Sequence, residues 1–415
     1  RSTRSPAGPP ISHMSKYRFS LQYPKPLTDE EFESLRPLFT AGGFSRYASG
    51  AAEELEGMFA KFFGVKHAVA CSSGTAAIHA ALIACDLPVG SEVITTPITD
   101  VGVVLPIIYQ NLVPVFADVD PTTFNLDAKS VESRITKNTS AIIAVHLAGN
   151  PAPIRELKAL ADKHNLILIE DCSQAHGAEY DGKRVGSMGK LGIASLQQSK
   201  HITSGEGGVI VTDDSALFER LKLSVDKGWT RFKSLRERRY EFLSLNYRYT
   251  GIQAAVVIPQ MKRVAGILKK KRDLAAYLYK RAEEFGGLVG CQRTLPGTQH
   301  SYYSFPMYVN GDEAMRDALM EMLAKDSGVE CAYGYANPVP LYLCTAALEN
   351  PKKFGRSFKY SDRSYPKGTC PAAEDLLNRS FLLPFNEKFE ISDMEYMMDA
   401  FAKAVAKLTP VGAGR

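Results

Sequence analysis

The chain has 415 residues, of which 45% are hydrophobic and 23% charged, and Lys plus Arg exceeds Asp plus Glu by five. This composition is ordinary for a globular protein, and the length predicts a large domain with a smaller one. The basic residues are spread along the chain, which excludes a nucleic-acid footprint. No apolar run reaches the roughly 18 residues that cross a bilayer, so we expect no membrane partner.

Seven cysteines are scattered without a C-x-x-C pair. This excludes a disulfide framework and a zinc or iron–sulfur site, and we expect no metal. A reducing, cytoplasmic location fits the cysteine usage. Residues 1–14, which end in Ser12-His13-Met14, look like an expression remnant and are left out of the fold prediction.

In chain order, residues 53–63 form an amphipathic helix that ends at Gly64, and 67–71 form a strand that leads into a helix over 76–84. Further strands are predicted at 93–96, 113–116, 141–147 and 166–169, with a helix from Ile154 before the last. Strands that alternate with helices predict an α/β fold with a mostly parallel mixed sheet sandwiched by helices. We assign residues 15–252 to this large domain.

The second half of the chain has a different pattern. Residues 226–249 are rich in charged and aromatic side chains and predict a loop followed by a short helix. A long connecting helix is predicted over 260–284, with Pro259 at its start, in a linking region 253–293. Residues 294–415 predict a smaller C-terminal α+β domain that ends in a helix over 393–408.

The junction Ser73-Gly74-Thr75 follows the strand 67–71 and opens a helix. Free N–H groups and the positive end of the helix dipole make such a junction an anion site, and Gly74 lets an anion approach the backbone. An ordinary Ser/Thr N-cap explains the same residues equally well.

Asp171 and Gln174 follow the strand 166–169, where side chains face the ligand crevice of a parallel sheet. A carboxylate opposite a pyridine nitrogen keeps that nitrogen protonated, and Gln174 is placed to donate to a phenolic oxygen on the same ring. The alternative is that Asp171 only caps the next turn.

Lys200 lies twenty-nine residues after Asp171, five after Ser195 and just before the Gly-rich turn at 205–208. This setting suits a Schiff-base lysine beside a phosphate, although most lone lysines are solvated surface groups. The three neighbourhoods occur in order within one α/β unit, and this order favours the functional interpretation.

From residue 30 to 408 the chain resembles the DegT/StrS group of sugar aminotransferases, which have pyridoxal-phosphate fold type I. The motifs that carry the resemblance are Ser73-Gly74-Thr75, Val145-His146-Leu147, Glu170-Asp171 with Gln174, Ser195 with Lys200, Thr203 through Gly208, Asn246-Tyr247-Arg248 and Cys370-Pro371-Ala372.

The resemblance implies a pyridoxal 5'-phosphate cofactor held in the large domain. Lys200 would form the Schiff base, Asp171 would pair with the ring nitrogen, and Gln174 would contact the phenolic oxygen. Ser73, Gly74, Thr75 and Ser195 would hold the phosphate. Asn246 would reach the phosphate of a neighbouring subunit, which implies a homodimer with shared active sites.

The resemblance also sets the expected reaction. Family members with His in place of the lysine are dehydratases, so Lys200 places this chain with the aminotransferases. Glutamate or glutamine is the expected amino donor, and the acceptor is a keto-cyclitol or a keto-sugar, free or nucleotide-linked. Gln197-Gln198 resembles the aminocyclitol-forming members, and a nucleotide-linked 3- or 4-keto-sugar stays equally open.

Other features stay open at this stage. Many family members stack an aromatic side chain on the cofactor ring, but Asp100 stands at that place. Trp229, Arg231, Arg236 and Arg239 either hold a sugar or pyrophosphate or form interface surface. Tyr302, Tyr333 and Tyr335 either line the rim of the site or pack in the core. A cofactor-binding regulator and a lyase of the same fold are the alternative functions.

Overall fold

The computed structural model describes residues 25, 27–285, 287–335, 338–349 and 361–408. The segment 1–14, interpreted above as an expression remnant, lies outside the described residues.

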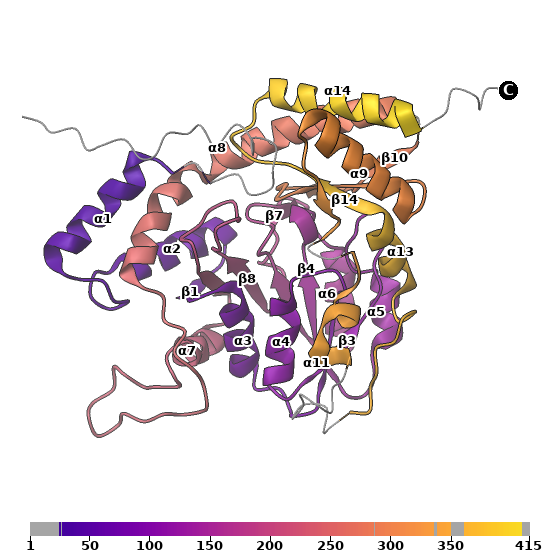
Figure 1. The fold of residues 1–415 in the computed structure, drawn as a ribbon. Coiled ribbons are helices and arrows are strands. Elements are labelled where there is room, and N and C mark those ends of the chain that lie inside the picture. The colour runs from indigo at the N-terminus through magenta and orange to yellow at the C-terminus, as the bar shows by residue number, and fades with distance from the viewer. Residues whose placement is uncertain (1–24, 26, 286, 336–337, 350–360, 409–415) are drawn as a thin grey trace, which may run out of the picture.

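A seven-stranded sheet forms the centre of the large domain (Figure 1). Its order is β1-β9-β8-β5-β4-β2-β3. The neighbouring pairs among β8, β5, β4, β2 and β3 are parallel, whereas β9 is antiparallel to both of its neighbours. The mostly parallel mixed sheet is therefore confirmed. The strand bounds are β1 (His67–Cys71), β2 (Glu92–Thr95), β3 (Val113–Phe116), β4 (Thr139–Val145), β5 (Ile167–Asp171), β8 (Leu191–Ser195) and β9 (Gly208–Thr212).

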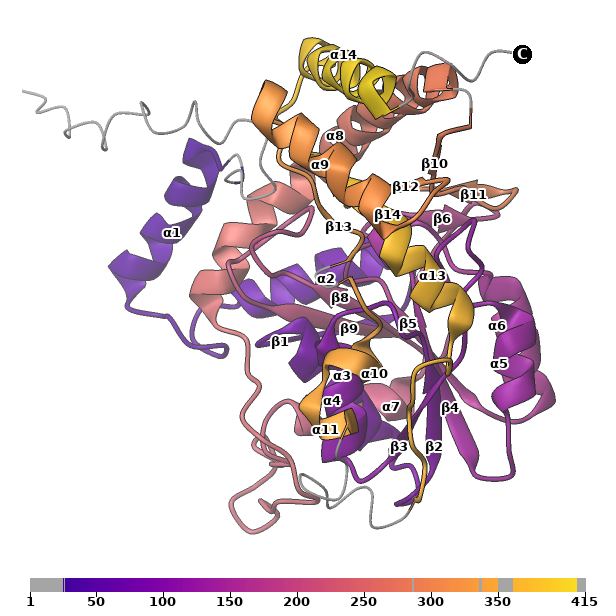
Figure 2. The same ribbon diagram turned by 45° about the vertical axis from the view of Figure 1, so that its right-hand side comes forward.

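Helices cover both faces of this sheet (Figure 2). One face carries α2 (Ala51–Phe63), α5 (Ala128–Arg134) and α6 (Ile154–Lys163), and the other carries α3 (Gly74–Cys85), α4 (Val101–Tyr109) and α7 (Ser215–Ser224). Strands that are covered on both faces contain continuous apolar runs, as Ala141 to Val145 in β4 illustrate.

The helix α8 (Gly251–Ala282) runs from beside α1 (Asp29–Ala41) to the C-terminal helices (Figure 1). The predicted start of this helix at Pro259 was wrong, because α8 begins at Gly251 and Pro259 lies inside it. Thr250 and Gln253 form a capping box that fixes this earlier start.

The predicted short helix within 226–249 is absent from the described structure. Isolated bridges join Asp226 to Asn246 and Trp229 to Tyr240 instead. The buried carboxylate of Asp226 pairs with Arg231 and Arg248, so ion pairs rather than a helix organise this loop.

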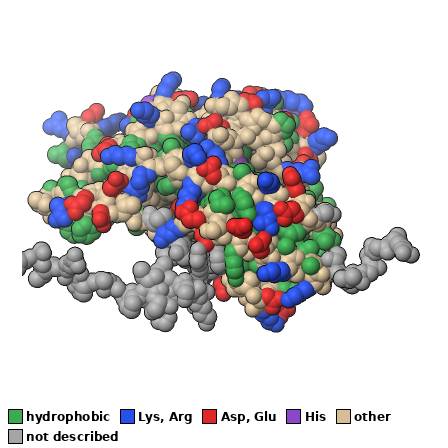
Figure 3. Space-filling model, turned by 90° about the horizontal axis from the view of Figure 1, so that it is seen from above, with side chains coloured by type: hydrophobic (Ala, Val, Ile, Leu, Met, Phe, Trp, Pro, Cys, Tyr) green, Lys and Arg blue, Asp and Glu red, His purple; other side chains and the backbone are tan. Residues whose placement is uncertain are grey.

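The C-terminal part is α+β, as predicted. A four-stranded sheet of order β10-β12-β14-β13 packs with the second half of α8 and with two helices around one apolar core. The bounds are β10 (Val289–Cys291), β12 (Phe305–Val309), β13 (Ala332–Tyr333), β14 (Ser380–Leu383), α9 (Glu313–Ser327) and α14 (Ile391–Leu408). Seen from above, this end of the molecule carries intermixed acidic and basic side chains (Figure 3).

One C-terminal segment returns to the large domain. Tyr342 packs against Phe116 at the end of β3, and Leu376 belongs to the same buried cluster. The segment contains α10 (Leu341–Cys344), α11 (Ala346–Glu349) and α13 (Pro371–Arg379). Short elements complete the fold: β6 (Glu179–Tyr180), β7 (Lys183–Arg184), β11 (Thr298–Gln299), η3 (Leu147–Gly149) and η4 (Glu283–Phe285). No described helix is long and apolar enough to cross a bilayer.

Candidate active site

The N-terminus of α3 offers unpaired donors to the crevice at the ends of the strands. Ser73 is the N-cap, and its Oγ accepts a hydrogen bond from the Ala76 N–H at 3.0 Å. The N–H groups of Gly74 and Thr75 come before this bond and have no partner within the described chain, as is usual for the first turn of a helix. Ser73 is thus both an N-cap and part of an anion-binding junction, so the two interpretations of this motif are compatible.

Gly74 allows a close approach between α3 and the end of β8. A Cβ at this position would lie 3.0 Å from the Ser195 Cβ and 3.2 Å from its Oγ. Ser195 therefore sits directly against the helix terminus, and its hydroxyl adds a donor beside the two N–H groups.

Asp171 ends β5 and is almost fully buried, with 4% of its surface exposed. Its Oδ1 accepts from the Ser173 N–H at 3.0 Å, so the turn-capping interpretation is also correct. Burial raises the pKa of the Asp171 carboxyl, and the Ser173 hydrogen bonds and the charge of Lys200 oppose this rise. A buried carboxylate that faces a cavity favours a cationic ligand group.

Glu170 and His146 hold the backbone on either side of Asp171. Glu170 is fully buried and accepts from the N–H groups of Gly186, Met188 and Gly189. His146 Nδ1 accepts from the Ala152 N–H at 2.9 Å, which makes Nε2 the protonated nitrogen, 3.2 Å from Glu170. This network fixes the ends of β4 and β5 at the site.

The amide of Gln174 has one defined orientation. Its Oε1 accepts from the Ala148 N–H at 2.8 Å, so Nε2 is the group that donates into the cavity. In this structure Nε2 donates to the Tyr335 hydroxyl at 2.7 Å. A donor at this place fits the predicted contact with a phenolic oxygen.

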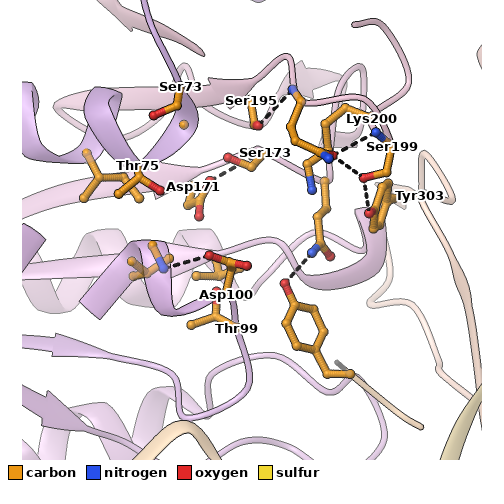
Figure 4. Close-up of a pocket in the computed structure, with 18 of the residues that line it drawn as sticks. Ser73, Thr75, Thr99, Asp100, Asp171, Ser173, Ser195, Ser199, Lys200 and Tyr303 are labelled. Atoms are coloured by element: carbon orange, nitrogen blue, oxygen red, sulfur yellow. Dashed lines mark hydrogen bonds between the residues drawn. The ribbon is translucent and has the colours of Figure 1, made fainter. Parts of the chain in front are cut away.

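Lys200 follows a short turn in which its own N–H donates to the Gln197 carbonyl at 2.9 Å. The Lys200 Nζ lies 4.5 Å from the centre of the Tyr303 ring. Figure 4 shows Lys200 and Asp171 on the wall of the same pocket, with Ser73, Thr75 and Ser195 around it.

The cavity has a volume of about 440 Å³ and brings together seven of the eight predicted residues. They are Ser73, Gly74, Thr75, Asp171, Gln174, Ser195 and Lys200. Asn246 does not line it. It is exposed in the 226–249 loop, where its Oδ1 accepts from the Arg248 N–H.

The three tyrosines that could line the rim or pack in the core lie in different places. Tyr335 lines the cavity, whereas Tyr302 stacks on His300 with ring centres 3.9 Å apart, and Tyr333 lies by Arg316 elsewhere. Tyr303 was missed, although it lines the cavity and its hydroxyl lies 2.7 Å from the Ser199 Oγ. The adjacent Tyr302-Tyr303 pair was the only available signal, and the pattern does not say which ring faces inward.

Two further expectations concern neighbouring segments. Gln197 lines the cavity and Gln198 does not. Trp229 and Arg231 line a separate hollow of about 640 Å³, where the Arg231 guanidinium lies 3.8 Å from the centre of the Trp229 ring. Arg236 and Arg239 are exposed.

The residues fit pyridoxal phosphate. One cavity offers a helix terminus for a phosphate, a buried carboxylate for a protonated ring nitrogen, an amide donor and a lysine amine. A metal site has no support among the described residues, since no three His, Cys, Asp or Glu side chains are grouped to hold an ion.

Residues 27–402 match the DegT/DnrJ/EryC1/StrS aminotransferase family. The chain belongs to this family. It is a pyridoxal-phosphate-dependent transaminase of fold type I, as the sequence resemblance implied.

Relatives and a solved structure support this assignment. The chain is 35% identical to the L-glutamine:2-deoxy-scyllo-inosose aminotransferase of Streptomyces kanamyceticus, over 77% of this chain and 78% of that protein. It is 34% identical to the GDP-perosamine synthase of Vibrio cholerae, over 78% of this chain and 86% of that protein. An aminotransferase structure from Psychrobacter cryohalolentis matches with a TM-score of 0.83 and 29% identity, over 94% of this chain and 99% of the other.

Proposed function

We propose that the protein transfers an amino group from glutamate or glutamine to a keto-cyclitol or a keto-sugar, in amino-sugar or aminocyclitol biosynthesis. The observation that carries the proposal is the single cavity in which Lys200, Asp171 and the α3 terminus converge. Bound pyridoxal phosphate supplies an electron sink for the carbon that loses its proton.

Each group of residues around the cavity has a separate role. The N–H groups of Gly74 and Thr75, with the Ser73 and Ser195 hydroxyls, bind the phosphate and anchor the cofactor. Asp171 keeps the ring nitrogen protonated, and Gln174 Nε2 donates to the phenolic oxygen. Lys200 would hold the cofactor covalently at rest, and its amine would then serve as the base that takes the proton from the donor carbon and returns it.

We further propose a homodimer with shared active sites. Asn246 is exposed and lies outside its own cavity, which agrees with a role at the phosphate of a neighbouring subunit. The exposed apolar side chains Phe232, Leu235 and Leu243 in the same loop give a contact surface for a second copy.

The acceptor class has two candidates. The aminotransferase from Streptomyces kanamyceticus, whose name gives 2-deoxy-scyllo-inosose as substrate, favours a keto-cyclitol, and the GDP-perosamine synthase favours a nucleotide-linked keto-sugar. The two relatives are about equally similar to this chain, so sequence identity does not decide between the two acceptors. The residues that line the acceptor side of the cavity must decide.

The test is a two-step absorbance experiment on the cofactor-loaded protein. Glutamate or glutamine should bleach the visible band, and a keto-cyclitol or nucleotide keto-sugar should restore it, as ping-pong kinetics require. A band that no amino donor changes would contradict the proposal and favour a regulatory protein. Net breakdown of an amino acid without amino transfer would favour a lyase.

A further inference from the structure

Asp100 and Tyr335 meet on one wall of the cavity, although they come from distant parts of the chain. Asp100 precedes α4, and Tyr335 follows β13 in the C-terminal part. Both also line a side chamber of about 120 Å³, together with Thr99. The other described residues around this chamber are apolar: Pro97, Ile98, Val101, Val339, Leu341 and Leu377. Among the described residues, Thr99 is thus the only other polar side chain that lines this chamber.

One carboxylate oxygen of Asp100 is fixed by a backbone hydrogen bond. Its Oδ1 accepts from the Gly102 N–H at 2.7 Å as the N-cap of α4, and the helix dipole favours its negative charge. A side chain on Gly102 would collide with Asp100 Oδ1 and Thr75 Oγ1, so glycine is needed here. The second oxygen is left as a hydrogen-bond acceptor, and Asp100 faces the pocket below Asp171 (Figure 4).

The phenol of Tyr335 is held as a donor. Its oxygen accepts from Gln174 Nε2 at 2.7 Å, which leaves its own proton free to donate. Burial raises the pKa of the Tyr335 hydroxyl, and the charge of Asp100 raises it further. The hydroxyl therefore stays protonated at neutral pH.

The side chains that this subunit places around the cavity carry more negative than positive charge. Among the described residues that line it, Lys200 is the only cation, against Asp100, Asp171 and Glu206. In the proposed function Lys200 is committed to the cofactor, so the wall around Asp100 and Tyr335 presents hydrogen-bond acceptors and a hydroxyl donor, which suit the hydroxyl groups of an uncharged acceptor.

We propose that Asp100 and Tyr335 form a hydroxyl-binding subsite that selects an uncharged polyhydroxy ring ketone as amino acceptor. Asp100 Oδ2 accepts from a hydroxyl near the reacting ketone, and the Tyr335 hydroxyl donates to the same or the adjacent oxygen. The pair determines specificity and takes no part in proton transfer. The inference rests on the proposed function, and it favours the keto-cyclitol over the nucleotide-linked sugar.

The experiment compares two ketones that differ only in hydroxyl groups. Wild type, Asp100→Asn and Tyr335→Phe are loaded with cofactor, aminated with glutamine, and mixed with scyllo-inosose or with cyclohexanone. Asn still caps α4, so Asp100→Asn should fold normally. Asp127→Asn is the matched control, because Asp127 caps α5 in the same way away from the cavity.

The expected result is a wild-type preference for the hydroxylated ketone, measured by second-order rate constants of the return of visible absorbance. Either cavity variant should reduce this preference by about tenfold or more, the loss expected for a hydrogen bond to a charged or buried partner. The preference is a ratio of two rates on the same aminated protein, so any change in amination by glutamine cancels from it. Calorimetric binding of unreactive scyllo-inositol should weaken in parallel, and Asp127→Asn should match wild type throughout.

Several outcomes would overturn the inference. An equal loss with both ketones would give the pair a general structural role, and unchanged binding of scyllo-inositol would remove the subsite. If glutamine bleaches the protein but neither ketone restores the band, the inference fails and the proposed function stands. If glutamine and glutamate both fail to bleach it, the proposed function fails.

Discussion

The polar side chains of the site share one arrangement, in which the backbone binds one atom and leaves the other to the cavity. Asp171 accepts from Ser173, Gln174 accepts from Ala148, and Asp100 accepts from Gly102. These bonds fix the side chains before any ligand arrives. A site of this kind loses little conformational entropy on binding.

The charge of Asp171 can be tested without changing its shape. Asp171→Asn keeps an acceptor for the Ser173 N–H but removes the negative charge that keeps the ring nitrogen protonated. We expect kcat to fall by about a hundredfold or more, a loss typical of a group that stabilises transition-state charge. Steady-state kinetics measure this, and an unchanged kcat would exclude Asp171 from the scheme.

Single residues could be predicted where the chain itself fixes their position. Asp171 and Ser195 end strands of a parallel sheet, and Lys200 follows within a short turn, so the sequence order brought them together. Tyr303 and Tyr335 could not be found in this way. They reach the cavity only because the C-terminal part folds over the large domain, and the sequence does not show that packing.

At the scale of elements, α8 contains a proline that another helix accommodates. Pro259 has no N–H, so the Ala255 carbonyl loses its partner within the helix. The Ser34 Oγ of α1 lies 2.7 Å from this carbonyl and equally near the Glu31 carbonyl. The contact explains how α8 continues through Pro259 and why α1 packs at this point.

This contact predicts a coupling between two substitutions. Ser34→Ala should lower the free energy of unfolding by about 1 kcal/mol, because the Ala255 carbonyl loses its donor. In a Pro259→Ala background the helix supplies its own N–H, and Ser34→Ala should cost much less. Urea unfolding of the four proteins of this cycle gives the coupling. Equal losses in both backgrounds would disprove the link.

The elements themselves were predictable to different degrees. The strand β3 was predicted at its observed bounds, because a short apolar run between helices has few alternatives. The start of α8 was missed because Pro259 was taken as a helix start, while the Thr250-x-x-Gln253 capping box was overlooked. The loop 226–249 is organised by ion pairs of Asp226 with Arg231 and Arg248, and the sequence does not show which of its many charged residues pair, so the lack of a helix could not be predicted.

At the scale of the whole molecule, a buried charge cluster joins the two parts of the chain. Lys271 of α8 lies 3.6 Å from Glu387, which follows β14, and Lys25 also pairs with Glu387 at 2.7 Å. Burial lowers the pKa of Lys271 to about 8, and the charge of Glu387 opposes this. Lys271 is therefore a group whose protonation differs between the folded and unfolded chain.

This difference predicts a pH dependence of stability. Between pH 8 and 10.5 the unfolded chain binds more protons at Lys271 than the folded chain, so its contribution makes stability rise with pH. Over this pH range the titration of Lys271 changes the free energy of unfolding by roughly 3 kcal/mol. Lys271→Met should remove this contribution to the pH dependence. The difference in free energy of unfolding between wild type and the variant should therefore change between pH 8 and pH 9.5.

Denaturant unfolding at several pH values measures the slope. Lys269→Met is the control, since Lys269 lies on the same helix but is exposed. A constant difference between wild type and Lys271→Met over this range would show that Lys271 titrates normally.

The proposed dimer predicts that two inactive variants complement each other. Lys200→Ala lacks the reactive amine, and Asn246→Ala lacks the phosphate contact offered to the other subunit. Refolded together, they should form mixed dimers with one intact site, giving about a quarter of wild-type activity for random pairing. Activity no higher than the mean of the two variants would contradict shared sites.

The general architecture was predictable because alternating apolar strands and helices leave few options besides a covered parallel sheet. The antiparallel β9 and the C-terminal segment that packs on Phe116 were not predictable, since both depend on contacts distant in sequence.

The most direct test of the central claim is to map the lysine that carries the cofactor. The pyridoxal-phosphate-loaded protein is reduced with borohydride, digested, and analysed by mass spectrometry. The account predicts a pyridoxyl-phosphate group on Lys200 and on no other lysine. Its attachment to a different lysine, or a cofactor that stays removable after reduction, would contradict the account.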